Sequence, residues 1–272
     1  DSASRGLGDV YKRQIEVIAP WREWDLSSRT DLMNYCKENQ IPMPASKAEE
    51  PPFSMDENLL HISYEGGVLE DLSNPPPEDM WLKVKSLDDA KADAEEIKIS
   101  FKKGDPIEIN DTKYSAAELL KVLNNLGCEH GIGRIDIVES RATGMKSRGC
   151  YETPGGTILL KARRAIESLC LSRDEILEKD AFMPSYAKLI YDGLWWSDKR
   201  LDLQKRIDSM SEKVCGTINL QLFKGNIITL GKESENSLYD ENKASFEAQG
   251  GFSNQDMAEY LSLIHISEPT RR

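Results

Sequence analysis

Residues 131–157 read GIGRIDIVESRATGMKSRGCYETPGGT, and this stretch decides the fold more than any other in the chain. Residues 134–139 have strand character, because isoleucine and valine favour extended backbone. The strand delivers the Glu139 carboxylate into a loop of glycine, basic and hydroxyl residues, which is followed by Tyr151 and a predicted turn at 154–156. This arrangement suits a polar pocket for a small zwitterion, although composition alone favours a surface hairpin with ordinary turn glycines.

Alternation and capping signals predict mixed structure around this stretch. Residues 96–101 alternate, which places their apolar residues on one face, and turns are expected at 103–105 and 224–226. Serine capping boxes open helices at Ser28, Ser115 and Ser172. Leu32 is expected to face inward, and Gly127 is expected to end its helix. Strands are expected at 15–19, 59–64, 96–101, 107–109, 134–139, 217–223 and 227–230, and helices at 28–38, 115–127, 159–171, 172–181, 185–195 and 198–213. Hairpins interspersed with helices predict an α+β fold in which helices pack on an antiparallel sheet.

Composition restricts the possible partners. The chain has 47 acidic and 35 basic residues, and its formal net charge of −12 argues against a general nucleic-acid or anionic-membrane partner. No apolar run approaches the roughly 18 residues of a membrane span. The five cysteines are scattered without a C-x-x-C pair, which is typical of reduced thiols. We therefore expect a cytoplasmic protein without a Cys/His metal site.

Two further blocks carry a family resemblance. Residues 53–65 read FSMDENLLHISYE, and residues 17–22 read VIAPWR. Together with GRIDIVE, GMKSRG and YETP, these blocks resemble argininosuccinate synthase, the ligase that joins citrulline to aspartate at the expense of ATP. The resemblance runs from about residue 15 to about residue 260, with Phe53 where the family usually has tryptophan.

The resemblance implies four citrulline-binding residues. Family positions that contact citrulline fall on Ser54, Ser63, Glu139 and Tyr151. A carboxylate suits the α-ammonium group, and hydroxyl groups suit the carboxylate and ureido groups. Each residue also has an ordinary structural alternative: Ser54 in a turn cap, Ser63 in a strand, Glu139 paired with Arg141 or Arg148, and Tyr151 in the core.

The resemblance further implies a two-step reaction. The ureido oxygen of citrulline attacks the α-phosphorus of ATP and expels pyrophosphate, and the aspartate amine then displaces AMP. The chain lacks both G-x-x-x-x-G-K-[ST] and the family's S-G-G-x-D-[TS] loop. We therefore expect ATP, with Mg²⁺, to be bound mainly by a missing N-terminal domain, and we assign no catalytic, ATP-binding or metal-ligating residue here. Arg134, Lys146 and Arg148 are candidates to face phosphate or carboxylate.

The two ends of the chain resemble each other at the level of codons. Residues 9–14 (DVYKRQ) and 261–266 (LSLIHI) can be encoded by reverse complements, GAT GTG TAT AAG AGA CAG and CTG TCT CTT ATA CAC ATC. This resembles a transposase adapter of sequencing libraries. We expect adapter translation at 1–14 and 261–272, the end of the missing nucleotide-binding domain and a linker at 15–27, the synthetase domain at 28–250, and a truncated C-terminal arm from 251 to 260.

Two hypotheses follow for function. The first is a fragment of argininosuccinate synthase, an enzyme of arginine biosynthesis and the urea cycle. Its substrates are citrulline, aspartate and ATP, the family is homotetrameric, and the fragment alone is expected to be inactive. The second is a free-standing amino-acid-binding or oligomerisation module without catalysis. Trp195 and Trp196 fit either a subunit contact or the core.

Overall fold

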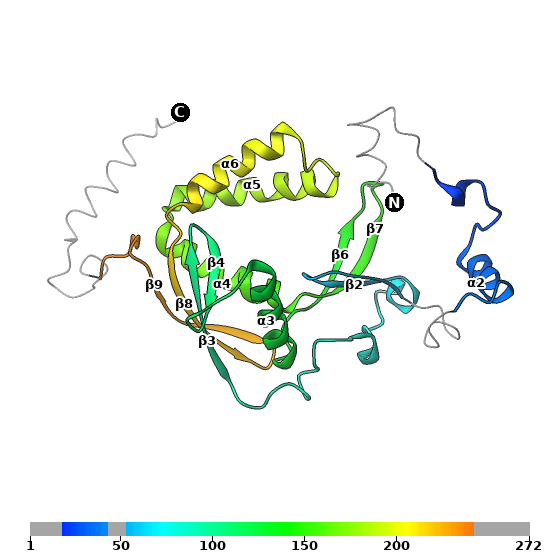
Figure 1. Ribbon diagram of the computed structural model, residues 1–272, viewed down its shortest axis with the longest axis horizontal. Coiled ribbons are helices and arrows are strands. Elements are labelled where there is room, and N and C mark those ends of the chain that lie inside the picture. The colour runs from blue at the N-terminus through cyan, green and yellow to red at the C-terminus, as the bar shows by residue number, and fades with distance from the viewer. Residues whose placement is uncertain (1–17, 43–52, 242–272) are drawn as a thin grey trace, which may run out of the picture.

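The computed structural model of the protein describes residues 18–42 and 53–241. The expectations for 1–14, 251–260 and 261–272, and those for 15–17, lie outside the described residues. Within this part, the strands form two antiparallel sheets, one of four strands in the order β1-β2-β7-β6 and one of five in the order β5-β4-β3-β8-β9. Helices pack against the larger sheet, and the predicted α+β fold is confirmed (Figure 1).

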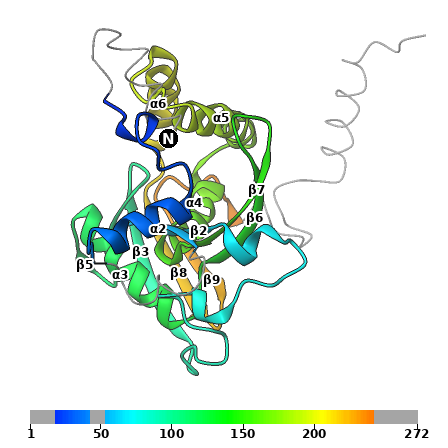
Figure 2. The ribbon, with the colours of Figure 1, turned by 90° about the vertical axis from the view of Figure 1, so that its right-hand side faces the viewer.

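The four-stranded sheet contains two strands from the stretch 131–157. Its members are β1 Ser54–Glu57, β2 Ile62–Glu65, β7 Lys146–Glu152 and β6 Arg134–Ser140. The β6–β7 hairpin extends beyond β2 (Figure 2). Much of the segment after Glu139 that was expected to be a polar loop thus forms β7, the second strand of a regular β-hairpin.

The five-stranded sheet is built from the β3–β4 and β8–β9 hairpins, and the short strand β5 pairs with the outer side of β4. Its members are β3 Glu95–Lys102, β4 Asp105–Ile109, β5 Thr112–Lys113, β8 Gly216–Phe223 and β9 Asn226–Glu233. Both hairpins have two-residue turns in which the two residues have positive φ: 52° and 86° at Lys103 and Gly104, and 39° and 79° at Lys224 and Gly225. Positive φ at both central positions is the type I′ geometry that matches strand twist. Both predicted turns are confirmed.

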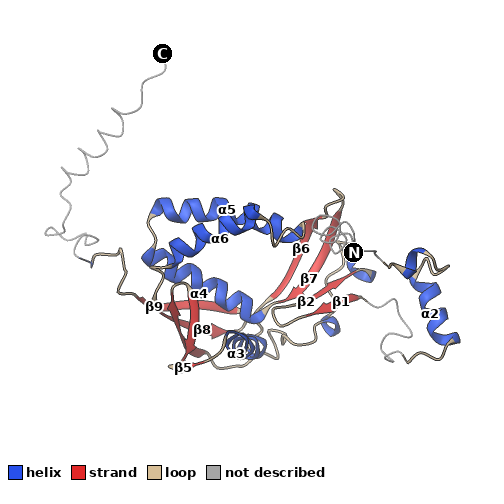
Figure 3. Cartoon of the chain, turned by 45° about the horizontal axis from the view of Figure 1, so that its top comes forward, coloured by secondary structure: helices blue, strands red, loops and turns tan. Residues whose placement is uncertain are grey.

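The helices follow the predicted capping signals. The longer ones are α2 Arg29–Glu38, α3 Ala116–Glu129, α4 Pro154–Cys170, α5 Arg173–Tyr191 and α6 Asp198–Ser211, with short 3-10 turns at η1 Pro20–Arg22, η3 Gly67–Glu70 and η4 Glu78–Met80. Capping boxes open α2, α3 and α5 at the predicted serines. Figure 3 shows α5 and α6 side by side, and α2 apart from both sheets.

The main core lies between the five-stranded sheet and helices α3 and α4. The predicted inward face of β3 is confirmed, since Ile97, Ile99 and Phe101 are buried. They pack with Leu119 and Leu123 of α3, with Ile158 and Ile166 of α4, and with apolar residues of β8. Alternation along the strands and helical spacing along α3 and α4 together produce this core.

Two local predictions are wrong. The expected turn at 154–156 is the first turn of α4, because Pro154 occupies a first-turn position where its fixed φ favours a helix. Gly127 does not end α3, which continues to Glu129. A side chain at Gly127 would place a Cβ atom 2.6 Å from Cβ of Pro154. The glycine therefore allows α3 to approach the start of α4.

Three further sequence predictions also need correction. The two helices expected at 172–181 and 185–195 are a single helix, α5, with Pro184 inside it. Contacts with α6 flank this proline on both sides, with Arg206 over the Phe182 ring and Tyr186 hydrogen-bonded to Gln204. Leu32 is exposed rather than inward, because α2 has little packed against it. Residues 18 and 19 precede η1 and form no strand.

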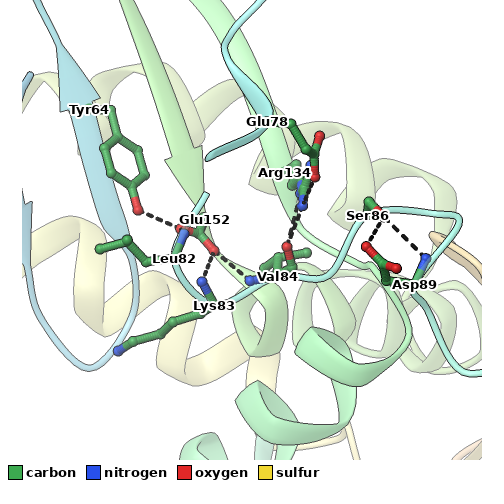
Figure 4. Close-up of polar contacts among 9 residues, drawn as sticks. All are labelled: Tyr64, Glu78, Leu82, Lys83, Val84, Ser86, Asp89, Arg134 and Glu152. Carbon is green, nitrogen blue, oxygen red and sulfur yellow. Dashed lines mark hydrogen bonds and ion pairs between the residues drawn. The ribbon is translucent and has the colours of Figure 1, made fainter. Parts of the chain in front are cut away.

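A second, smaller core lies beneath the four-stranded sheet and is organised by a buried carboxylate. Glu152 accepts hydrogen bonds from the Tyr64 hydroxyl (2.5 Å) and from the backbone N–H groups of Leu82 (2.8 Å), Lys83 (2.9 Å) and Val84 (2.6 Å) (Figure 4). Arg134 donates to the carbonyl oxygen of Val84 from Nε (3.1 Å) and Nη2 (2.5 Å). Glu152 and Arg134 thus hydrogen-bond the backbone of the segment 81–85 and hold it against the sheet.

We predict that Glu152→Ala destabilises the protein by about 3 kcal/mol, because it leaves three backbone donors and one hydroxyl without their acceptor. The measurement is the free energy of unfolding from urea denaturation. Glu96→Ala is the matched control, since Glu96 is an exposed carboxylate on β3. Its expected effect is within about 0.5 kcal/mol. Equal losses in the two variants would contradict the anchoring role of Glu152.

Candidate functional site

Strand register places the four predicted residues on one face of the four-stranded sheet. Side chains alternate between the faces of a strand, and directly paired residues share a face. The pairs Asp56–Ser63, Ser63–Tyr151 and Ile135–Tyr151 connect all four strands. Ser54 lies two residues from Asp56, and Glu139 lies four from Ile135. We call this the polar face, defined by Ser54, Ser63, Glu65, Glu139, Ser147 and Tyr151.

Tyr151 and Glu139 are joined directly. The Tyr151 hydroxyl donates to Oε1 of Glu139 at 3.0 Å. The ring lies along β7 over Gly149, where a Cβ atom would be 2.7 Å from the Tyr151 hydroxyl oxygen. The absence of a side chain at Gly149 therefore gives the Tyr151 ring its place on the sheet.

Burial raises the pKa of Tyr151 to about 12, and the hydrogen bond to Glu139 and the charge of Glu139 add to that effect. The positive charge of Arg141 works in the opposite direction. The folded protein therefore favours the neutral phenol. The stability that this contributes is fully present below the ordinary pKa of tyrosine, and it is lost as the pH rises from there through the raised pKa.

Arg141 connects two strands at the open end of the polar face. It follows β6, and its Nε donates to the Ser147 hydroxyl at 2.7 Å. Its Nη2 donates to the Glu65 carboxylate of β2. Arg141 therefore pairs with Glu65 rather than with Glu139, whose hydrogen bond is to Tyr151.

The two serines have different surroundings. Ser63 lies opposite Tyr151 in the strand register, and its hydroxyl donates to the carbonyl oxygen of Asp56 at 3.5 Å. Ser54 is exposed and lines a cavity of about 380 Å³ together with Glu65 and Ser147. The structure thus places all four predicted residues on one face but joins only Glu139 and Tyr151 by a hydrogen bond. Their role in binding citrulline stays a prediction.

The basic residues proposed to face phosphate or carboxylate lie differently. Arg134 and Arg148 point to the opposite face, because they occupy the alternate register positions of β6 and β7. Arg148 forms a bidentate pair with Asp136, at 2.8 and 2.6 Å, and Arg134 pairs with Glu78. Lys146 is exposed, bonds the Ser140 hydroxyl at 2.6 Å and lines the cavity beside Ser54.

A larger cavity lies away from the four predicted residues. It has a volume of about 610 Å³ and lies between the β1–β2 turn, α3 and the start of α4. Its lining includes Lys83, Lys121 and Asn124. None of the four predicted residues lines this larger cavity. The predicted citrulline site is therefore not the larger of the two cavities.

The described residues hold no group of three His, Cys, Asp or Glu side chains placed to bind a metal ion. Across residues 18–42 and 53–241, no helix is long and apolar enough to cross a membrane.

Sequence reasoning missed two residues of the polar face, Glu65 and Ser147, and it considered Arg141 only as a partner of Glu139. The alternation of β6 and β7 could have placed Ser147 beside Glu139 once the hairpin register was known. The Arg141–Glu65 pair spans 76 positions of sequence, so no local pattern could have predicted it.

Comparisons with known proteins agree on one family. The family model described as the arginosuccinate synthase C-terminal domain matches residues 53–269. The argininosuccinate synthase of a Sulfurovum species is 55% identical over 249 residues, which is 92% of this chain and 56% of the relative. That of a Nitratiruptor species is 52% identical, over 92% of this chain and 61% of the relative. That of Ectopseudomonas mendocina is 51% identical, over 93% of this chain and 63% of the relative.

The two antiparallel sheets and the names of these relatives define the class of the chain as an α+β domain of a ligase family. The chain spans between 56 and 63% of the length of these three relatives. It belongs to the argininosuccinate synthase family, in the part that the family model describes as the C-terminal domain.

We predict that Gly149→Ala displaces the Tyr151 ring and separates its hydroxyl from Glu139. The pKa of Tyr151 should then fall from about 12 towards its ordinary value. The measurement is phenolate absorbance during alkaline titration, with Tyr151→Phe subtracted in each background to isolate this tyrosine.

Gly231→Ala is the matched control for this substitution. Gly231 also lies in a strand, and an added Cβ atom would meet only Asn219 Nδ2 at 3.5 Å, an ordinary contact. We expect no change in the Tyr151 titration. An unchanged titration in Gly149→Ala would mean that the ring does not depend on the missing side chain.

Proposed function

We propose that this chain is the citrulline-binding and oligomerisation portion of argininosuccinate synthase, with its synthetase domain at residues 28–250. The whole protein ligates L-citrulline and L-aspartate and releases AMP and pyrophosphate. Membership of the family supports this proposal, and the observation that carries it is the Glu139–Tyr151 pair on the polar face. The placement of Ser54 and Ser63 on that same face adds support.

The chemistry of the polar face fits a zwitterionic amino acid with a neutral, hydrogen-bonding side chain. Glu139 supplies a carboxylate for the α-ammonium group, in a charge-assisted hydrogen bond. Ser54, Ser63 and the neutral Tyr151 phenol supply hydroxyl groups for the carboxylate and ureido groups. A site built on such hydrogen bonds discriminates against analogues that lack the matching groups.

The reaction proceeds in two steps under this proposal. The ureido oxygen attacks the α-phosphorus of ATP and pyrophosphate leaves; the aspartate amine then displaces AMP from the citrulline adenylate. This part of the enzyme contributes by holding citrulline in position. ATP is bound mainly by a nucleotide-binding portion outside this chain. Mg²⁺ would bind there with it and neutralise the charge of its phosphates. The whole protein acts as a cytoplasmic homotetramer.

We predict that the chain binds L-citrulline and that Glu139→Gln weakens binding at least about tenfold, because one charge-assisted hydrogen bond is lost. Isothermal titration calorimetry measures the dissociation constant. Glu96→Gln is the control, as an exposed carboxylate on the other sheet, and should leave binding unchanged. Equal affinity in the wild type and Glu139→Gln would remove Glu139 from the site.

We predict that residues 15–260 alone form no AMP from ATP, citrulline and aspartate. A chimera that joins these residues to the uncovered portion of the Sulfurovum relative should restore citrulline-dependent AMP formation, and Glu139→Gln should abolish it. AMP formation by residues 15–260 alone would overturn the proposed division of labour.

The alternative is a free-standing module that binds an amino acid without catalysis. It predicts citrulline binding together with a folded chimera that forms no AMP. The chimera experiment therefore separates the two functions.

A further inference from the structure

Arg141 and four side chains of the polar face form one electrostatic cluster. The Arg141 guanidinium donates to Ser147 and to the Glu65 carboxylate, while Tyr151 donates to Glu139. Partial burial works against the charge of Arg141, but the carboxylates of Glu65 and Glu139 outweigh it and raise the pKa of the guanidinium. Both carboxylates therefore lie within electrostatic reach of the same positive group.

The charges of this cluster do not cancel. Glu65 and Glu139 contribute two negative charges, Arg141 contributes one positive charge, and Ser147 and Tyr151 are neutral. Because Arg141 pairs directly with Glu65, the Glu139 carboxylate is the one left for a positively charged ligand group. The cluster therefore has one carboxylate available, for one positively charged group of the ligand.

Arg141 is held in this position by geometry. Its Nε is engaged by Ser147 of β7, and the outer edge of the guanidinium is engaged by Glu65 of β2. A planar guanidinium with both of these edges bonded has a fixed direction. It cannot turn away from a ligand without breaking both contacts.

We propose that Arg141 is a specificity-determining positioning residue: by neutralising Glu65, it makes the site accept an amino acid with a neutral side chain and reject one whose side chain carries a second positive charge. This inference rests on the proposed function, because it assumes that the ligand binds on the polar face. The rejected class is the basic amino acids, of which ornithine is a close match in length.

The expected size of the effect follows from Coulomb's law. Charges a few ångströms apart near a protein surface can change an affinity by tenfold or more. The Arg141 side chain is 37% exposed, so solvent screens part of this interaction. We therefore expect a change of about fivefold in the ratio of two dissociation constants, that of ornithine divided by that of citrulline.

The experiment measures this ratio by calorimetry on the full chain. Arg141→Gln should lower the ratio about fivefold, mainly through tighter ornithine binding. Arg141→Lys keeps the charge and should hold the ratio within about twofold of the wild type. Arg164→Gln is the control, since this arginine pairs with Asp180 at the α4–α5 contact, and the ratio should not change.

Glu65→Gln provides an opposite test that does not depend on the folding of the Arg141 variants. It removes one negative charge and leaves Arg141 unneutralised, so the ratio should rise by a similar factor of about five. Thermal melting of each variant reports whether the fold is retained.

The outcomes are distinct. A fall of the ratio in Arg141→Gln and a rise in Glu65→Gln support the inference. An unchanged ratio in Glu65→Gln, or equal weakening of both ligands in Arg141→Gln, assigns Arg141 a structural role only and overturns it, while citrulline binding by the wild type still supports the proposed function. A wild-type chain that binds neither ligand overturns both.

Discussion

The buried carboxylate of Glu152 is the interaction on which the rest of the four-stranded sheet depends. A charge in a nearly dry environment is tolerated only when it is fully hydrogen-bonded, and Glu152 meets this requirement with three backbone N–H groups and the Tyr64 hydroxyl. Those donors come from β2 and from the segment 81–85, which are far from β7 in sequence. The Glu152 side chain therefore holds β7 against β2 and against the segment 81–85.

The same anchor determines what the other side of the sheet presents. Residues of β7 alternate in direction, so Glu152 pointing inward requires Tyr151 to point to the polar face. A shift of register by one residue would exchange the two and would bury Tyr151 in place of the carboxylate. The order of the polar face thus follows from a hydrogen-bond network on the opposite side. Immediately after Glu152 the chain enters α4, whose first turn contacts Gly127 of α3, so the anchor also lies beside the main core.

The predictability of the chain divides according to the range of the interactions. The β-hairpins at Lys103–Gly104 and Lys224–Gly225 and the serine-capped helices rest on local chemistry, and the sequence predicts them correctly. The continuity of α5 through Pro184 and the role of Gly127 depend on contacts with other helices, which no local pattern contains. Ser54, Ser63, Glu139 and Tyr151 came from family motifs, and strand register then placed them on one face. The Arg141–Glu65 pair was missed because it links distant segments, and Arg141 was considered only as a partner of Glu139.

Gly149 and Tyr151 constrain each other's identity. The tyrosine ring occupies the space in which a side chain at position 149 would lie, so any larger residue at 149 competes with the ring for the same volume. The two positions should therefore covary among homologues. A family member without an aromatic residue at the position of Tyr151 is free to carry a side chain at 149, whereas one that keeps the tyrosine must keep the glycine. Variation at the two positions is thus coupled by volume, even though Gly149 has no chemical role.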